Sequence, residues 1–318
     1  MVASAALLLP AIFRKYWLSV AIGLGWVTVD LLIFGMGYNP AISRDLYYPA
    51  TPAIEWLKQD PANFRIWGEK SVLVPDTAEI YGLKDARGCD FMAVRRYEEL
   101  ITGTAGDFYF YSVAAGVPRS FPLLSVKYAM VFKSTPLDPG WFEQVYSNEV
   151  TIYRYRPFHE RAMAVFNYQV EPDPASILAR VRSGGFDPAR VLLLEDQPTD
   201  IHAPSQIQTS TADTNSFARI VAEQADEVTI TAFLSRPGFV LLLDTYFPGW
   251  TATVNGVKSP ILRADYNFRA VQVPAGKSTV RFVYQPAGFR LGMVLFPAGL
   301  LVMAGVWFGP WKRCKADQ

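Results

Sequence analysis

The chain has 318 residues, of which 51% are hydrophobic and 19% are charged. The charged fraction lies below the ~25% of ordinary soluble domains, and the apolar content is too high for a disordered chain. The 30 Lys and Arg residues nearly balance the 29 Asp and Glu residues, so no basic field would attract nucleic acid. Two cysteines and two histidines exclude a disulfide framework and a Cys/His zinc cluster.

Two apolar segments, one near each end, have the length of membrane spans. Residues 16–36 contain a single charged residue, Asp30, and residues 291–311 contain none. At about 1.5 Å per residue, an α-helix of either segment crosses a hydrocarbon core about 30 Å thick. We therefore predict two transmembrane helices. Asp30 is a candidate intramembrane functional residue because a carboxylate is costly in lipid; the alternative is that water reaches it from the outer end.

Basic residues flank the two segments on the sides that would face one compartment. They precede the first segment at residues 14–15 and follow the second at residues 312–315. Because basic residues mark the cytoplasmic side of a membrane, both clusters are predicted to be cytoplasmic, residues 38–287 extracytoplasmic, and the lipid bilayer a partner. An apolar run at residues 3–13 is too short to span alone; we interpret it as the end of a helix whose beginning is missing, or as a short interfacial helix.

The middle of the chain divides by composition into two parts joined by a polar segment. Residues 38–196 alternate helical and strand patterns, which is typical of a mixed α/β domain. Residues 197–215 are rich in Ser, Thr, Pro and Asp and are predicted to be a linker. Residues 216–287 contain strand patterns only and are predicted to form a small antiparallel β-sandwich, with Asn255-Gly256 as its strongest hairpin sequence.

The individual elements follow from capping residues, apolar spacing and alternation. Thr51-Pro52 begins one helix, and Gly184-Gly185 closes another. Predicted helices cover residues 51–60, 95–101 and 174–182, and predicted strands cover residues 64–67, 72–74, 123–132, 141–146, 150–155, 162–170 and 191–194. The sandwich strands are expected at residues 217–223, 227–233, 238–244, 250–254, 259–263, 267–273 and 278–285.

The expected fold class is a membrane-anchored α+β protein in which two transmembrane helices flank an extracytoplasmic mixed α/β domain and a C-terminal antiparallel β-sandwich. Cys89 and Cys314 then lie on opposite sides of the membrane and cannot pair with each other. The expected order is a partial helix and cytoplasmic loop (1–15), a transmembrane helix (16–37), the mixed domain (38–196), the linker (197–215), the β-sandwich (216–287), a second transmembrane helix (288–311) and a cytoplasmic tail (312–318).

The chain lacks the sequence motifs of common enzyme and nucleotide sites. It contains no GxGxxG, P-loop, HExxH or GxSxG pattern. His159 and His202 stand alone and are interpreted as solvated surface histidines. We expect no cofactor, no metal and no nucleic-acid partner; the identity of any catalytic residue, and whether the chain is an enzyme, are left open.

One candidate ligand-binding group contains Arg87, Asp90 and Arg96. The guanidinium of Arg96 has the fork geometry that binds a phosphate or a carboxylate through two hydrogen bonds. The alternative is a structural ion pair of Arg87 with Asp90 that ties a loop to the sheet, made possible by the backbone freedom of Gly88 between them.

A second candidate group contains Asp244, Tyr246 and Trp250. A carboxylate beside aromatic rings can hold a sugar, because the rings stack on its apolar face and the carboxylate accepts its hydroxyl protons. The alternative is a core tryptophan beside a turn. Arg269 ends a polar corner at residues 263–269 and is also a candidate, with a purely structural role as the alternative.

Longer stretches of the sequence resemble a known family. Residues 244–292 (DTYFPGWTATVNGVKSPILRADYNFRAVQVPAGKSTVRFVYQPAGFRLG) are similar to the C-terminal region of the YfhO-type bacterial membrane proteins. Residues 38–60, 64–68 and 81–100 resemble the stretch that follows the penultimate cluster of spans in that family. Most of the resemblance is carried by the turn at Trp250, the Asn255-Gly256 hairpin and the Arg-Gly-x-Asp stretch at residues 87–90.

The resemblance implies a polytopic protein of the bacterial cell (inner) membrane, similar to C-type glycosyltransferases that use polyprenyl-phosphate sugars to glycosylate envelope polymers such as teichoic acids. In that superfamily the acidic catalytic residue lies in the first external loop, which this chain begins too late to contain, so no catalytic residue is carried over. We expect the chain to position an acceptor, with an envelope glycan, a polyprenyl-phosphate sugar and a missing N-terminal transmembrane portion as partners. The alternative is a non-catalytic, membrane-anchored carbohydrate-binding or scaffolding module.

Overall fold

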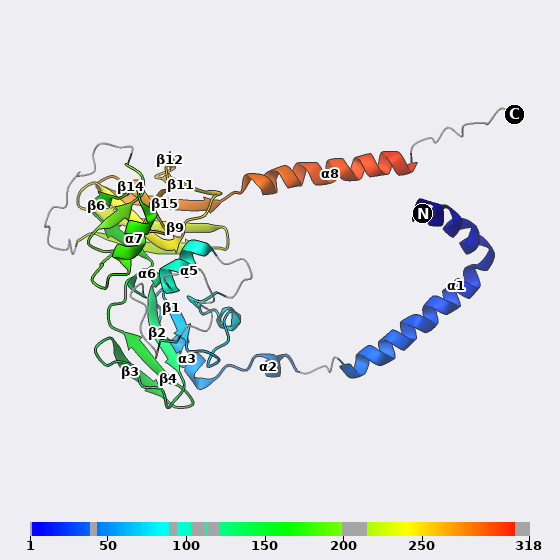
Figure 1. Cartoon of the computed structure of the whole chain (residues 1–318), viewed down its shortest axis with the longest axis horizontal. Helices are drawn as coiled ribbons and strands as arrows, with labels where there is room; N and C mark the ends of the chain where they lie inside the picture. Colours follow the sequence, from blue (N-terminus) through cyan, green and yellow to red (C-terminus); the bar gives the residue numbers. More distant parts are fainter. Residues whose placement is uncertain are drawn as a thin grey trace. The chain divides into compact units, whose positions relative to one another are not determined.

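The computed structural model contains long apolar helices and a folded region rich in β-strands (Figure 1). The chain divides into two compact units, Met1–Ala50 and Thr51–Gln318. The structure describes residues 2–38, 43–88, 94–102, 112–113, 121–198 and 215–308. The expected cytoplasmic tail and most of the expected linker lie outside the described residues.

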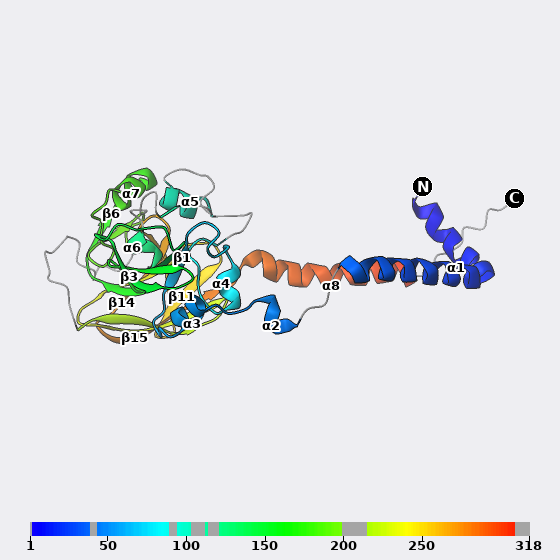
Figure 2. The same cartoon turned by 90° about the horizontal axis from the view of Figure 1, so that it is seen from below.

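The first unit consists of helix α1 (Val2–Tyr38) and the short helix α2 (Arg44–Tyr47). Helix α1 bends at Tyr16, whose φ of −124° and ψ of 21° interrupt the helical backbone, and the bend is visible in Figure 2. The part that follows, Tyr16–Met36, is solvent-exposed and has a mean hydropathy of 1.9. The helix therefore has the length and composition of a membrane span where the sequence predicts one.

The last element, α8 (Ala287–Phe308), has the same character. Its Ala287–Gly305 part has a mean hydropathy of 1.7 and is not buried against other described parts of the chain. Only residues 285–286 separate it from the final strand of the folded region, so the strand leads directly into the helix. Both predicted helices are thus present, each long and apolar enough to cross a membrane.

A four-stranded sheet occupies the N-terminal half of the second unit. Its strand order is β1 (Arg65–Gly68), β2 (Val126–Val131), β4 (Thr151–Tyr155) and β3 (Phe142–Ser147). Strands β1 and β2 are parallel, and the other pairs are antiparallel. Helix α3 (Pro52–Lys58) begins at Thr51, whose side chain accepts a hydrogen bond from the Ile54 amide. The buried Ile54 and Leu57 of this helix share one hydrophobic cluster with the sheet.

Two further sheets form the remainder of the second unit. The six-stranded sheet has the order β5 (Ala162–Val165), β10 (Gly238–Thr245), β14 (Phe268–Val273), β13 (Leu262–Ala264), β7 (Leu192–Leu194) and β6 (Tyr168–Val170). The antiparallel five-stranded sheet has the order β12 (Val257–Ser259), β11 (Trp250–Val254), β15 (Gly276–Tyr284), β9 (Glu227–Leu234) and β8 (Phe217–Glu223). The short helices are α4 (Thr77–Ile80), α5 (Arg95–Thr102), α6 (Phe121–Leu124) and α7 (Pro174–Val181).

Strand β10 lies at the centre of the hydrophobic core. Its residues alternate between two clusters: Val240 and Leu242 pack with the five-stranded sheet, whereas Phe239, Leu241 and Leu243 pack on the opposite side. Because successive strand residues point to opposite faces, a strand buried on both faces must be apolar throughout. The six- and five-stranded sheets therefore pack against one another across the first of these clusters.

The expected division into a mixed domain (38–196) and a separate sandwich (216–287) does not coincide with the sheets. The six-stranded sheet takes β5, β6 and β7 from one side of residues 197–215 and β10, β13 and β14 from the other. It also contains a parallel pair, β6 with β7, so it is not purely antiparallel. Strand β10 needs a hydrogen-bonding partner along each edge, because buried backbone groups must be paired. One of these partner strands, β5, lies far from β10 in the sequence.

Four predicted strands differ in detail. The strand expected at residues 123–132 begins only at Val126, and residues 121–124 form helix α6. Residues 72–74 form a turn region, whose Leu73 carbonyl accepts a hydrogen bond from a buried arginine. Residues 162–170 divide into β5 and β6, which lie at opposite edges of one sheet. The strand expected at residues 259–263 is interrupted at Pro260, which lacks the N–H that pairing requires. The Asn255-Gly256 hairpin is confirmed, and the positive φ angles of 52° and 82° are those of a type I′ turn.

Replacing Leu241 by Ala should lower the free energy of unfolding by about 2–5 kcal/mol, because the side chain is fully buried in β10 and its removal leaves a cavity. Denaturant unfolding of the full chain in detergent, followed by tryptophan fluorescence, measures the loss. Val221→Ala on β8 is the control, since Val221 is 60% exposed and should change little. Equal effects of the two variants would contradict the assignment of β10 to the core.

Candidate functional site

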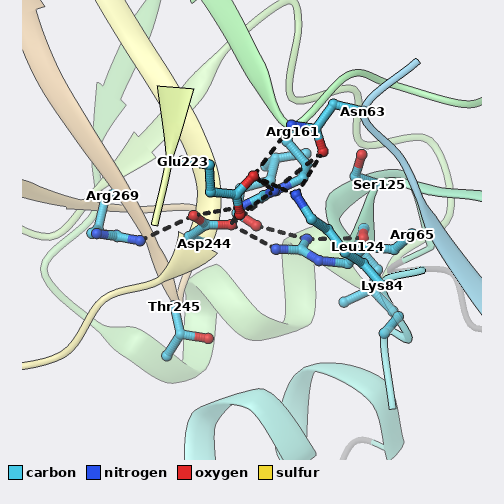
Figure 3. A network of polar contacts seen from close by, with 12 residues as sticks. Asn63, Arg65, Lys84, Leu124, Ser125, Arg161, Glu223, Asp244, Thr245 and Arg269 are labelled. Atoms are coloured by element: carbon cyan, nitrogen blue, oxygen red, sulfur yellow. Dashed lines mark hydrogen bonds and ion pairs between the residues drawn. The ribbon is translucent and has the colours of Figure 1, made fainter. Parts of the chain in front are cut away.

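A buried carboxylate, Asp244, lies near the end of β10 and binds three arginines (Figure 3). Arg65 donates a hydrogen bond of 2.6 Å to its Oδ1 atom. Arg161 donates from Nη2 to both carboxylate oxygens at 2.9 Å. Arg269 donates from Nη2 to Oδ2 at 3.1 Å. These arginines come from β1, from the residue before β5 and from β14, so the carboxylate joins segments that are distant in the sequence.

A second carboxylate, Glu223 at the end of β8, extends this group. Arg161 donates from Nη1 to its two oxygens at 2.8 and 2.9 Å, and Lys84 forms an ion pair with it. Asn63 accepts hydrogen bonds from both Lys84 and Arg161, at 3.1 and 3.2 Å. We call this group the Asp244–Glu223 network; it consists of Asn63, Arg65, Lys84, Arg161, Glu223, Asp244 and Arg269 (Figure 3).

Both carboxylates of the network are held in the ionised form. Burial by itself raises the pKa of Asp244, but the surrounding Arg65, Arg161 and Arg269 outweigh it and lower that pKa to about 2. For Glu223, the raising effect of burial is outweighed by Lys84 and Arg161, and its pKa is also lowered. Neither group therefore has a proton to donate at neutral pH, and each nitrogen of the Arg161 guanidinium has a partner. The network is suited to holding the fold rather than to acid–base chemistry.

The network brings three of the sequence candidates together. Arg269 contacts Asp244 on one side, and its guanidinium carbon lies 3.9 Å from the ring centroid of Trp250 and 5.2 Å from that of Phe282. Burial lowers the pKa of Arg269 to about 10, so the group stays charged at neutral pH. Its Nε and Nη1 atoms have no hydrogen-bond partner among the described residues, and the aromatic faces offset this loss by cation–π attraction. Trp250 thus binds an arginine of its own chain.

Arg96 and Tyr246 lie in a neighbouring group. Arg96 forms an ion pair with Glu195 and donates a hydrogen bond of 2.9 Å to the Tyr266 carbonyl. Arg263 contacts the same Glu195 at 3.3 Å and lies 4.4 Å from the centroid of the Tyr246 ring. Arg96 therefore has an internal counter-charge in Glu195.

Arg87 is completely buried and pairs with Asp85 at 2.6 Å, and it donates hydrogen bonds to the carbonyls of Lys70 and Leu73. Asp90, its expected partner, lies outside the described residues, and so does His202. His159 was expected to be solvated, but its side chain is only 24% exposed, and Nε2 lies 3.5 Å from Asp187. Asp30 lies on the exposed apolar part of α1 and is distant in the sequence from Arg87 and His159.

Sequence analysis treated the corner at residues 263–269 as a polar turn and missed the carboxyl group at its centre. Asp265 is fully buried and has a φ of 48°, and its Oδ1 atom accepts a hydrogen bond of 2.8 Å from the Leu193 amide. Its Oδ2 atom has no partner among the described residues. Burial raises the pKa of Asp265 to about 8, so the group is protonated at neutral pH.

A cavity of about 180 Å³ opens beside the Asp244–Glu223 network, and sequence analysis did not find it. Glu160 and Arg219 line it and are exposed, and neither side chain forms an ion pair within the described part of the chain. The complete lining is Pro61, Asn63, Glu160, Arg161, Ala162, Arg219 and Ile220. We call it the Glu160–Arg219 pocket. Its residues come from three separated segments, so no local pattern indicated it.

The described residues contain no group of three or more His, Cys, Asp or Glu side chains placed to hold a metal ion. In the comparison with protein families, residues 228–296, from β9 into α8, match the family described as bacterial membrane protein YfhO. Neither the curated proteins nor the solved structures gave a match. The resemblance to YfhO-type proteins is confirmed over these residues, and with the two apolar helices it indicates a membrane protein.

Replacing Asp244 by Asn should destabilise the fold by about 3–5 kcal/mol at pH 7, because the buried Arg161 and Arg269 and the half-buried Arg65 lose their shared counter-charge. The pKa of about 2 lies below the usual 3.8, so the stabilisation is present above about pH 4 and is lost as the pH falls toward 2. Unfolding free energies at pH 7 and pH 3 should therefore differ less in D244N than in the wild type. Glu227→Gln, which removes an exposed ion pair with Arg281, is the control. A wild-type-like pH dependence in D244N would contradict the prediction.

Replacing Asp265 by Asn should have the opposite pH dependence. The pKa of about 8 lies above the usual 3.8, so the folded state holds a proton that the unfolded state releases, and stability is lost as the pH rises from about 4 through 8. Asn keeps the acceptor for the Leu193 amide and has no proton to lose. D265N should match the wild type at pH 4 and exceed its stability by at least about 1 kcal/mol at pH 8.5. A constant difference between the two proteins across this pH range would show that Asp265 is ionised in the folded state.

Proposed function

We propose that this chain is the membrane-anchored, extracytoplasmic binding portion of a YfhO-type membrane protein. In this proposal the folded region between the two apolar helices holds an envelope glycan as the acceptor of a sugar. The transfer itself, from a polyprenyl-phosphate sugar, belongs to a further membrane portion of the system. The family match and the two apolar helices support the membrane assignment. The lowered pKa values of Asp244 and Glu223 keep both carboxylates ionised at neutral pH, which argues against acid–base catalysis at that site.

The Glu160–Arg219 pocket is the observation on which the binding role rests. Glu160 offers acceptors, Arg219 offers donors, and Pro61 and Ile220 offer apolar surface. A sugar ring needs this combination, because its hydroxyl groups both donate and accept hydrogen bonds while its C–H faces pack on apolar groups. The volume of about 180 Å³ is below the ~300–1,000 Å³ of pockets for drug-sized ligands, which favours a single sugar unit.

The Asp244–Glu223 network holds one lining residue of the Glu160–Arg219 pocket in place. Arg161 lines the pocket, and Asp244, Glu223 and Asn63 hold its guanidinium in one orientation. A binding site whose groups are already ordered loses less conformational entropy when the ligand arrives. Glu160 and Arg219 then remain to recognise the ligand, with the Arg219 guanidinium placed 5.5 Å from the centroid of the Phe217 ring.

A carbohydrate-binding module without any part in sugar transfer is the second candidate. One observation favours it: the pocket residues, from Pro61 to Ile220, all lie outside the region 228–296 that matches the family. The pocket can therefore serve a binding role of its own. A transfer assay separates the two candidates, because only the first requires that glycan binding by this chain increase transfer.

Binding is tested with the full chain in non-ionic detergent, by calorimetric titration with oligosaccharide fragments of bacterial envelope polymers. We expect saturable binding that weakens about tenfold, or about 1.4 kcal/mol, in both Glu160→Gln and Arg219→Gln. Arg190→Gln is the matched control, because Arg190 is 84% exposed and does not line the pocket. Absence of binding in the folded wild type, or equal affinity in all variants, would overturn the binding role.

The transfer role is tested by adding a polyprenyl-phosphate sugar to the chain alone and to the chain co-expressed with the N-terminal spans of a YfhO-type protein. We expect transfer only in the second case, reduced in Glu160→Gln. Transfer by the chain alone would contradict the proposed division of labour. Transfer that is unchanged in a variant with lost glycan binding would favour the second candidate.

A further inference from the structure

A second pocket, of about 310 Å³, lies where β2, β3 and β4 of the four-stranded sheet come together, and none of its residues was a sequence candidate. Three basic residues, one acidic residue and two aromatic rings line it. They are Lys127 on β2, Glu143 on β3, Arg154 and Tyr155 on β4, and Arg156 and Phe158 just after β4. We call it the Arg156 pocket.

Two of the three cations in the Arg156 pocket already have counter-charges. Arg154 pairs with Glu143 at 2.6 Å, and Lys127 pairs with Asp60, which lies outside the lining. Arg156 is exposed and forms no ion pair with any described residue. The pocket therefore retains a positive charge and a guanidinium whose donors are free.

The walls of the pocket are partly apolar. The ring of Tyr155 is buried and packs against Trp141 and Phe142, with centroids 6.4 and 5.4 Å away. Burial raises the pKa of the Tyr155 hydroxyl, so it remains a proton donor, and it makes no hydrogen bond within the described part of the chain. Phe158 lies under Lys127, with the ammonium group 5.6 Å from the ring centroid.

We propose that the Arg156 pocket binds the phosphate group of a phosphate-bearing ligand. An arginine fork with further cationic donors nearby matches the several oxygens and the charge of a phosphate. A cationic ligand would be repelled by the surplus charge, and a neutral sugar would leave the guanidinium without a counter-charge. The organic part of the ligand packs on the Phe158 ring. This site is separate from the Glu160–Arg219 pocket and does not depend on the proposed glycan role.

The ligand phosphate can belong to a lipid headgroup or to a soluble phosphate ester, and the experiment has an arm for each. The full chain in non-ionic detergent is titrated calorimetrically with glycerol 3-phosphate and inorganic phosphate in one arm. In the other arm it is titrated with short-chain phosphatidylglycerol below its critical micelle concentration, with short-chain phosphatidylcholine as the zwitterionic control. Binding in the first arm assigns a soluble ester, and binding in the second arm alone assigns a headgroup.

Three variants decide whether the pocket is responsible. Arg156→Gln should weaken binding at least tenfold, and Glu143→Gln should strengthen it severalfold, because it removes the carboxylate that occupies Arg154. Arg190→Gln, an exposed site elsewhere, should bind as the wild type does. Arg156 is exposed and Glu143 is half-buried, and unchanged thermal unfolding verifies that both variants fold. No phosphate binding in either arm, or binding that R156Q leaves unchanged, would overturn the proposal.

Discussion

The structure of the folded region depends on a single buried carboxylate. Burying Asp244 without partners would be costly, and three arginines from three separate elements remove that cost. Arg65 brings in the edge strand of the four-stranded sheet, Arg161 leads into β5, and Arg269 belongs to β14. The interaction therefore connects the four-stranded and six-stranded sheets through charge, in addition to the apolar contacts of β10.

This arrangement has a consequence for function. In the sequence, Asp244, Trp250 and Arg269 are candidates for binding a ligand. In the structure Arg269 contacts both Asp244 and Trp250, which leaves these groups little capacity to bind a ligand. The charged side chains that form no ion pair among the described residues of the two pockets are Glu160, Arg219 and Arg156. The segment from Arg154 to Ala162 contributes to both, with Arg156 at one pocket and Glu160 at the other, and its Arg161 is fixed by the network. Arg219 comes from β8. Ordered interior charges and available peripheral charges are the division that the proposed binding role requires.

Local sequence patterns predicted the elements that depend on local physics. The apolar helices follow from length and hydropathy, α3 follows from the Thr51 cap, and the hairpin follows from the need for positive φ at Asn255 and Gly256. Four strands of the five-stranded sheet, β8, β9, β11 and β15, were predicted to within a few residues for the same reason, whereas β12 was not. What could not be predicted is the pairing over long distances. Arg65 and Asp244 are 179 residues apart, and no pattern near either residue indicates the other.

The central claim is that Asp244 and the arginines around it stabilise the fold as one coupled unit, and a double-mutant cycle tests it most directly. The free energies of unfolding of the wild type, Asp244→Asn, Arg161→Met and the double variant are measured in the full chain in detergent at pH 7. A coupling energy of about 1.5–3 kcal/mol between the two positions, within the range seen for residues in contact, is the predicted result. Additive losses, with a coupling energy near zero, would contradict the claim.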